Sequence, residues 1–163
     1  MKTETRTDES SSHLDGFNKF EIRPQLMEYG KKVTMGAKTD LISCSIQVIA
    51  NGGETNMHAH GGNDAIWLVM QGKARFYTIG PDGNHDELAA ELDKNEALVI
   101  KRETPYWFES ASDENLVILR FGAQAQNEPP RRIDHDDRQF TVPGAEGGVQ
   151  REIRFIDKFF GDE

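Results

Sequence analysis

Two histidines, His58 and His60, lie two residues apart in a segment that reads as a β-strand, TNMHAH (residues 55–60). Side chains on a strand alternate between its two faces, so both imidazoles are expected to point the same way. Imidazoles that share a face can hold a divalent metal ion, but a catalytic zinc or iron usually has three protein ligands. The pair therefore predicts a possible metal-binding face, for which a third ligand must be found.

Asp64 is the carboxylate that follows the pair most closely in the sequence. Strand alternation alone turns it away from the histidines, whereas a β-bulge would bring it back to their face. Two histidines and one carboxylate suit Fe(II), Mn(II) or Zn(II). Tyr106, Glu54 and Glu103 are further possible ligands, and a phenol binds a metal only when the ion lowers its pKa.

Short β-strands are the elements expected to position these residues. No segment keeps a helical period over three turns, and ELAAELD (87–93), which could form one helical turn, lies between strands. Many short strands at regular spacing are typical of a sandwich or a closed barrel. The expected strands are 41–50, 55–60, 65–71, 73–79, 87–93, 96–102, 105–110 and 115–123.

Alternation along these strands predicts which side chains face the core. In LISCSIQVIA (41–50) the residues assigned to the core face are Ile42, Cys44, Ile46 and Val48. Trp67 shares a face with Ala65, and Tyr106 shares one with Phe108. An aromatic lining of Trp67, Tyr106 and Phe108 could hold a planar or apolar substrate. More often such residues are simply barrel core, because aromatic side chains bury large areas.

Composition divides the chain into three parts. Residues 1–16 are polar and charged, which predicts a disordered tail. Residues 17–122 carry the strand pattern and form the expected barrel. Residues 123–163 read as an arm whose apolar end, with Phe155, Phe159 and Phe160, is expected to pack on the barrel or on a partner subunit.

Charge and composition restrict the classes of partner. The formal net charge of −9 disfavours non-specific binding to nucleic acid or anionic lipid, and the short basic run Pro130–Arg132 reads as a solvated surface. No apolar run is long enough to span a bilayer, and the first 16 residues contain no apolar segment of a signal peptide. Cys44 is the only cysteine, so an internal disulfide is impossible. These features predict a cytoplasmic protein that binds neither nucleic acid nor membrane.

The segment around the two histidines resembles the first conserved motif of the cupins, G-x5-H-x-H-x3,4-E-x6-G. Gly52, His58, His60 and Gly72 match it in register, and Ala65 stands where the family has glutamate. The resemblance covers roughly residues 40–122 and is strong for the fold and for this motif.

The second cupin motif, G-x5-P-x-G-x2-H-x3-N, is matched weakly by NEALVIKRETPYWFES (95–110). Anchored on PYWFES, its histidine position is Tyr106. Its two glycines become Asn95 and Glu103, its proline becomes Lys101 and its asparagine becomes Ser110. Two of the four residues that bind the metal in the family, the glutamate and this histidine, are therefore replaced.

The resemblance implies an all-β fold, a double-stranded β-helix or jelly-roll barrel with N- and C-terminal arms, in a homodimer. It also implies a small-molecule enzyme with Fe, Zn, Mn or Ni held by His58 and His60. Asp64, which its place in the sequence suggests, would be the third ligand, and Tyr106 would donate a proton or orient the substrate by a hydrogen bond. The reaction stays open among dioxygenase, isomerase, lyase and hydrolase chemistry. Two alternatives remain: a metal-free isomerase or cyclase that uses His58, His60 and Tyr106 as acid/base groups, and a barrel that binds a small molecule without catalysis.

Overall fold

The computed structural model describes residues 16–136 and 152–162, and every regular element within these ranges is a β-strand. No helix in this part of the chain is long and apolar enough to cross a membrane. The strands are β1 (Gln25–Tyr29), β2 (Lys31–Lys38), β3 (Ile42–Ile49), β4 (His58–Gly61), β5 (Asn63–Gln71), β6 (Ala74–Thr78), β7 (Glu87–Leu92), β8 (Ala97–Ile100), β9 (Trp107–Ser110), β10 (Leu116–Gln124), β11 (Arg131–Asp134) and β12 (Arg154–Phe159).

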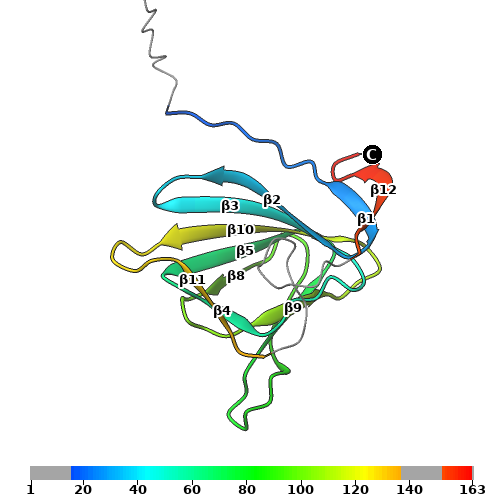
Figure 1. The fold of residues 1–163 in the computed structure, drawn as a ribbon. Coiled ribbons are helices and arrows are strands. Elements are labelled where there is room, and N and C mark those ends of the chain that lie inside the picture. Colours follow the sequence, from blue (N-terminus) through cyan, green and yellow to red (C-terminus); the bar gives the residue numbers. More distant parts are fainter. Residues whose placement is uncertain (1–15, 137–151, 163) are drawn as a thin grey trace, which may run out of the picture.

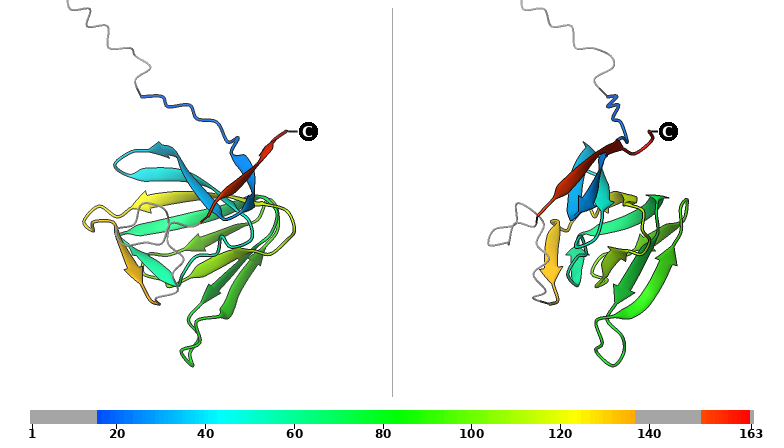
Figure 2. Two further views of the ribbon diagram at one scale, coloured as in Figure 1. Left: turned by 45° about the vertical axis from the view of Figure 1, so that its right-hand side comes forward. Right: turned by 90° about the vertical axis from the view of Figure 1, so that its right-hand side faces the viewer.

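The strands form two facing walls (Figures 1 and 2). One wall is an antiparallel sheet in the order β2-β3-β10-β5-β8, and the other contains the groups β7-β6-β9 and β11-β4. A bridge between His58 and Tyr106 joins β4 to the start of β9 and so continues the second wall. The predicted all-β barrel is confirmed, and residues 87–92 form a strand.

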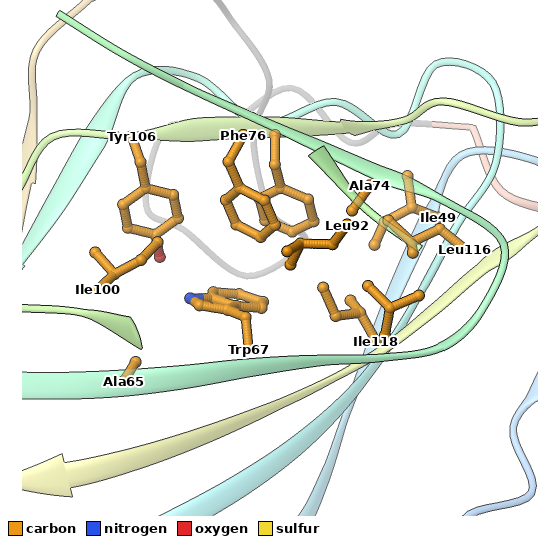
Figure 3. Packing of buried hydrophobic residues seen from close by; sticks show 12 residues of the cluster. Ile49, Ala65, Trp67, Ala74, Phe76, Leu92, Ile100, Tyr106, Leu116 and Ile118 are labelled. Atoms are coloured by element: carbon orange, nitrogen blue, oxygen red, sulfur yellow. The ribbon is translucent and has the colours of Figure 1, made fainter. Parts of the chain in front are cut away.

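The interior of the barrel is filled at one end by aromatic and aliphatic side chains. Trp67 from β5 faces Tyr106 and Phe76 on the opposite wall (Figure 3). Phe76 and Phe108 stack with ring centroids 4.9 Å apart, and Trp67 lies 4.9 Å from Phe108. The buried cluster comprises Ile49, Ala65, Trp67, Val69, Ala74, Phe76, Leu92, Ile100, Tyr106, Phe108, Leu116 and Ile118. Burial of so many large apolar side chains makes this end the main source of stability.

The predicted core face of β3 faces outward. Val48 packs with Met27 of β1 in a second apolar cluster outside the barrel. Cys44 lines an apolar hollow on the same outer face, next to Phe121 and Val99. Alternation therefore turns the polar side chains of β3, including those of Ser45 and Gln47, into the barrel.

The two ends of the described chain close over this outer face. β12 pairs antiparallel with β1, and Ile153 and Phe160 pack against the cluster around Met27. Within the expected arm, β11 pairs with β4 and so belongs to the barrel wall. The predicted disordered tail falls on residues 1–15, which lie outside the described residues, as do residues 137–151.

Candidate functional site

His58 and His60 lie side by side on β4, and Tyr106 faces them from the start of β9. The ring centroids of the two histidines are 5.1 Å apart, and the Tyr106 ring lies 4.7 Å from His58 and 6.2 Å from His60. Reciprocal backbone hydrogen bonds of 3.0 and 2.9 Å between His58 and Tyr106 hold the two segments in this register. The structure thus brings together the three residues that the sequence assigned to acid/base chemistry.

The backbone agrees with the alignment that placed Tyr106 opposite the histidines. Gly52 and Gly72, the glycines of the first motif, have φ values of 74° and 75°. Asn95 and Glu103, which stand at the glycine positions of the second motif, have φ values of 69° and 64°. Positive φ is uncommon for residues other than glycine. The degenerate motif has therefore kept the turn geometry while its side chains changed.

His58 is held as a neutral imidazole. Its Nδ1 lies 2.7 Å from the backbone oxygen of Asn56, and a carbonyl can only accept, so Nδ1 carries the proton and Nε2 is an acceptor. Its side chain is buried, and burial together with the positive charge of Arg132 lowers the His58 pKa to about 3. Burial, Arg120 and Arg132 lower the pKa of His60 to about 4.

Tyr106 is held as a neutral phenol. Complete burial raises its pKa to about 12, against the opposing effects of Arg120 and Arg132. Arg120 donates a hydrogen bond to its hydroxyl oxygen. All three ring systems at this site are therefore uncharged at neutral pH.

Three cations surround the rings, together with one carboxylate, that of Asp134, which acts against them on the pKa of His60. Arg120 projects from β10, bonds the Asn63 side chain and lies with its guanidinium carbon 5.8 Å from the Trp67 ring centroid. Arg132 from β11 bonds Asn56, and its Nε donates to Asp134 at 2.8 Å. Lys31 also lies close enough to lower the pKa of both histidines.

Sequence reasoning missed the two arginines. Arg120 interrupts the apolar run LVILRFGA, and that interruption was the available signal of a functional position. Arg132 belongs to the basic run that was interpreted as a solvated surface, yet β11 pairs with β4 and places Arg132 opposite His60. Arg131 and Arg132 are exposed, as that interpretation predicted, but the pairing of β11 with β4 also brings the charge of Arg132 next to the histidines.

A hollow of about 320 Å³ opens beside His60, Arg120 and Arg132. Its volume falls at the lower end of the range for small-molecule sites, roughly 300–1,000 Å³. The residues that line it are Met35, Lys38, Ser43, His60, Gly61, Asn63, Arg120, Gln124, Pro130, Arg131 and Arg132. Trp67 and Phe108, which were predicted to line a substrate pocket, instead belong to the buried apolar cluster.

Asp64 lies away from the histidines. Its carboxylate accepts a hydrogen bond of 2.7 Å from the backbone N–H of Arg102 and is 45% exposed. It lines the outer apolar hollow together with Ile66 and Val99, so no bulge has turned it inward. This placement does not support Asp64 as the third metal ligand.

The described residues do not fit a divalent metal ion. No group of three or more His, Cys, Asp or Glu side chains within 16–136 and 152–162 has the geometry of a metal site. Two neutral imidazoles beside Arg120, Arg132 and Lys31 provide too few donors and a local positive charge that opposes a cation.

No protein-family model matches the chain, and no curated protein sequence is significantly similar to it. Solved structures do resemble it. An uncharacterised Klebsiella pneumoniae protein with a double-stranded β-helix domain aligns with a TM-score of 0.53 and 13% identity, over 64% of this chain and 85% of that one. A cupin superfamily protein from Desulfitobacterium hafniense aligns with a TM-score of 0.51 and 14% identity, over 66% and 99%.

A Bacillus subtilis oxalate decarboxylase, a protein with Mn(II) centres, also aligns, with a TM-score of 0.52 and 17% identity. The alignment covers 68% of this chain and 29% of the decarboxylase. Sequence identities this low support a shared fold only. The chemistry of the site must be argued from its own residues. The two facing walls, the motif turns and these structural relatives together identify the chain as a cupin-fold protein, a double-stranded β-helix.

Proposed function

We propose that this barrel binds a small molecule in the hollow beside His60 without a metal ion and without catalysing its conversion. The observation that carries the proposal is the composition of the site: two neutral histidines and a neutral tyrosine among three cations. Such a site offers fixed hydrogen-bond donors and acceptors. It lacks the acidic ligands with which proteins hold divalent ions.

The pKa values support binding over catalysis. A general acid or base works best when its pKa lies near the working pH. Burial moves the pKa of His58 to about 3, of His60 to about 4 and of Tyr106 to about 12. All three groups therefore exchange protons poorly at neutral pH, which suits recognition of a ligand in one fixed pattern of donors and acceptors.

A metal-free acid/base enzyme is the second candidate, and one observation favours it. Burial is the largest cause of the lowered His60 pKa, and the charges of Arg120, Arg132 and Lys31 lower it further. A bound anion would offset those charges and raise the His60 pKa towards neutrality. In that case the substrate itself would make His60 a competent base. The homodimer and the cytoplasmic location remain predictions.

The test measures metal content and ligand retention on the same protein. Metal is determined before and after incubation with Fe(II), Zn(II), Mn(II) and Ni(II). The protein is then mixed with the small-molecule fraction of a cell extract, and retained compounds are detected by native mass spectrometry. We expect substoichiometric metal and at least one retained compound. A Ser43→Trp variant, which fills the hollow from β3, should lose that compound.

Three results would overturn the proposal. One is a stoichiometric metal ion that disappears in a His58→Ala/His60→Ala variant. Another is equal retention by wild type and Ser43→Trp, which would place the ligand elsewhere. The third is no retained compound in the wild type. Recovery of a retained compound in chemically altered form, altered by wild type and not by His60→Gln, would replace binding by the second candidate.

A further inference from the structure

Arg120 is a charged side chain inside the barrel whose hydrogen bonds within the described residues are with neutral groups. It projects from β10, with buried apolar residues before it on the strand. Its terminal nitrogen donates to the Asn63 amide oxygen, and it bonds the Tyr106 hydroxyl. Within the described chain its Nε, which is buried, has no hydrogen-bond partner and no carboxylate pairs with it. A partly buried guanidinium without an acidic partner is costly unless an anion joins it.

The other arginines at the hollow already have acidic partners. Arg131 pairs with Glu103, and Arg132 pairs with Asp134. Arg120 is therefore the guanidinium at this opening whose positive charge is not matched by an acidic side chain among the described residues. A planar guanidinium offers two parallel N–H donors to a carboxylate or phosphate, which a point charge cannot.

Three polar side chains converge beside Gly122, the residue two positions after Arg120. A Cβ atom at Gly122 would lie 2.9 Å from Arg120 Nη1, from Asn63 Oδ1 and from Ser43 Oγ. Because the Asn63 oxygen already accepts from Arg120, the groups that remain available are the Asn63 amide N–H, the Ser43 hydroxyl and the guanidinium. This is a cluster of donors, the pattern that an anion requires.

We propose that the ligand carries an acidic group, a carboxylate or a phosphate, and that Arg120 binds that group with help from Ser43 and Asn63. The inference rests on the proposed small-molecule site and adds the chemical class of its ligand. A second hollow of about 570 Å³ adjoins the first and shares Ser43, Asn63 and Gln124 with it. The acid would lie at Arg120, and the rest of a small organic acid would extend into this space.

The cations at the hollow contrast with the net charge of the whole chain, which is −9. A protein with such an excess of carboxylates repels anions at most of its surface. Lys38 and Arg120 line the opening, and Arg131 and Arg132 there are paired with Glu103 and Asp134, so the positive charge offered to an acid comes mainly from Lys38 and Arg120. A small acid is therefore drawn to this one end of the barrel.

The experiment compares matched acids and amides. Acetate, benzoate and phosphate, with acetamide and benzamide as neutral counterparts, are titrated at constant ionic strength, and binding is followed by amide chemical shifts. In the wild type we expect the acids to shift residues around the hollow and the amides to bind at least about tenfold more weakly. Comparison of the benzoate and phosphate titrations distinguishes a carboxylate from a phosphate ligand.

Variants assign the effect to Arg120. Arg120→Gln should weaken acid binding about tenfold to a hundredfold, and Arg120→Lys should keep part of the affinity, since it retains the charge and loses the fork. Arg75→Gln removes the same charge from an exposed pair with Glu91 and should bind as wild type does. Without ligand, Arg120→Gln should melt no lower than the wild type, because it removes an uncompensated buried charge. A structural role for Arg120 predicts the reverse.

Several outcomes would overturn the inference. Equal affinity for acids and amides would do so, as would unchanged acid binding in Arg120→Gln, or no binding of any acid by the wild type. If acids fail while a neutral compound is retained from the extract and lost in Ser43→Trp, the proposed function stands and the acidic ligand does not. If neither acids nor extract compounds bind, both are refuted.

Discussion

The two ends of the barrel interior are built from the same strands but differ in polarity and packing. β10 places Leu116 and Ile118 at the apolar end, and two residues later Arg120 at the open end. β5 places Trp67 among aromatic rings, while Asn63 at its start bonds Arg120. The first end is filled and dry, whereas the second keeps polar groups around a hollow. The comparison teaches that stability and recognition are separated along each strand.

Truncation at the apolar end should give the largest effect on stability. Trp67 is 2% exposed and contacts the rings of Phe76, Phe108 and Tyr106. Trp67→Ala should lower the free energy of unfolding by about 3–5 kcal/mol, through lost burial and the cavity left behind. Urea denaturation measures it. Ser43→Ala at the open end is the matched control and should stay within about 0.5 kcal/mol of wild type. Comparable losses in both variants would contradict the division of the barrel.

A lower pH should reduce the free energy of unfolding, because His58 and His60 at the open end must then take up protons. The pKa values of His58 and His60 are about 3 and about 4, below the 6.5 of a free histidine, so the unfolded chain takes up protons first as the pH falls. Their stabilising contribution is complete above pH 6.5 and is lost as the pH falls from about 6.5 to about 4 for His60 and to about 3 for His58. Each tenfold change in proton affinity corresponds to about 1.4 kcal/mol, so the loss should be of the order of a few kcal/mol. It is reduced because water screens the partly exposed His60.

The slope of stability against pH checks this prediction. Urea unfolding is measured every half unit of pH for the wild type and for His58→Gln/His60→Gln. The wild-type free energy should fall more steeply than that of the variant over the stated range, whatever their difference at pH 7. The variant keeps all carboxylates, so it controls for their titration. Parallel curves would show that the histidines are not held neutral.

Replacement of the outward-facing carboxylate should give the smallest effect. Asp64→Asn keeps an acceptor for the Arg102 backbone N–H and removes only an exposed ion pair, 3.4 Å from Arg102 Nε. Stability should change by less than about 1 kcal/mol, and ligand retention should not change. Thermal melting and native mass spectrometry provide the two measurements. Loss of a bound metal or of the ligand in Asp64→Asn would contradict this prediction and indicate that Asp64 takes part in binding.

Much of the fold could be predicted from local pattern, because turn residues and period-2 alternation are short-range signals. The shared face of His58 and His60 also followed from spacing, and the position of Tyr106 near them followed from the resemblance to the second cupin motif. Alternation could not say which face of β3 points inward. Cys44 and Val48 were assigned to the barrel core, yet both face outward: Val48 packs with Met27 of β1, and Cys44 lines the outer hollow with Phe121. Both faces of this strand are buried, so hydrophobicity alone does not distinguish inside from outside.

The cationic character of the site could not be read from motifs, since it depends on two long-range pairings. Arg132 reaches the histidines because β11 pairs with β4, across some 70 residues of chain. Arg120 faces inward because β10 lies between β3 and β5. A count of charges gives −9 and does not show the cations at the hollow. The surroundings of the two histidines could therefore be identified only from the three-dimensional structure.

The position of Trp67 gives the protein an internal fluorophore. The chain has two tryptophans, and the other, Trp107, stacks on Tyr77 with ring centroids 4.2 Å apart and bonds the backbone oxygen of His85. Trp107→Phe would leave the indole of Trp67 as the sole tryptophan emitter. Its ring lies close to the Arg120 guanidinium. A change of charge at that guanidinium would then alter the emission of Trp67, so occupancy of the barrel could be followed optically without a label.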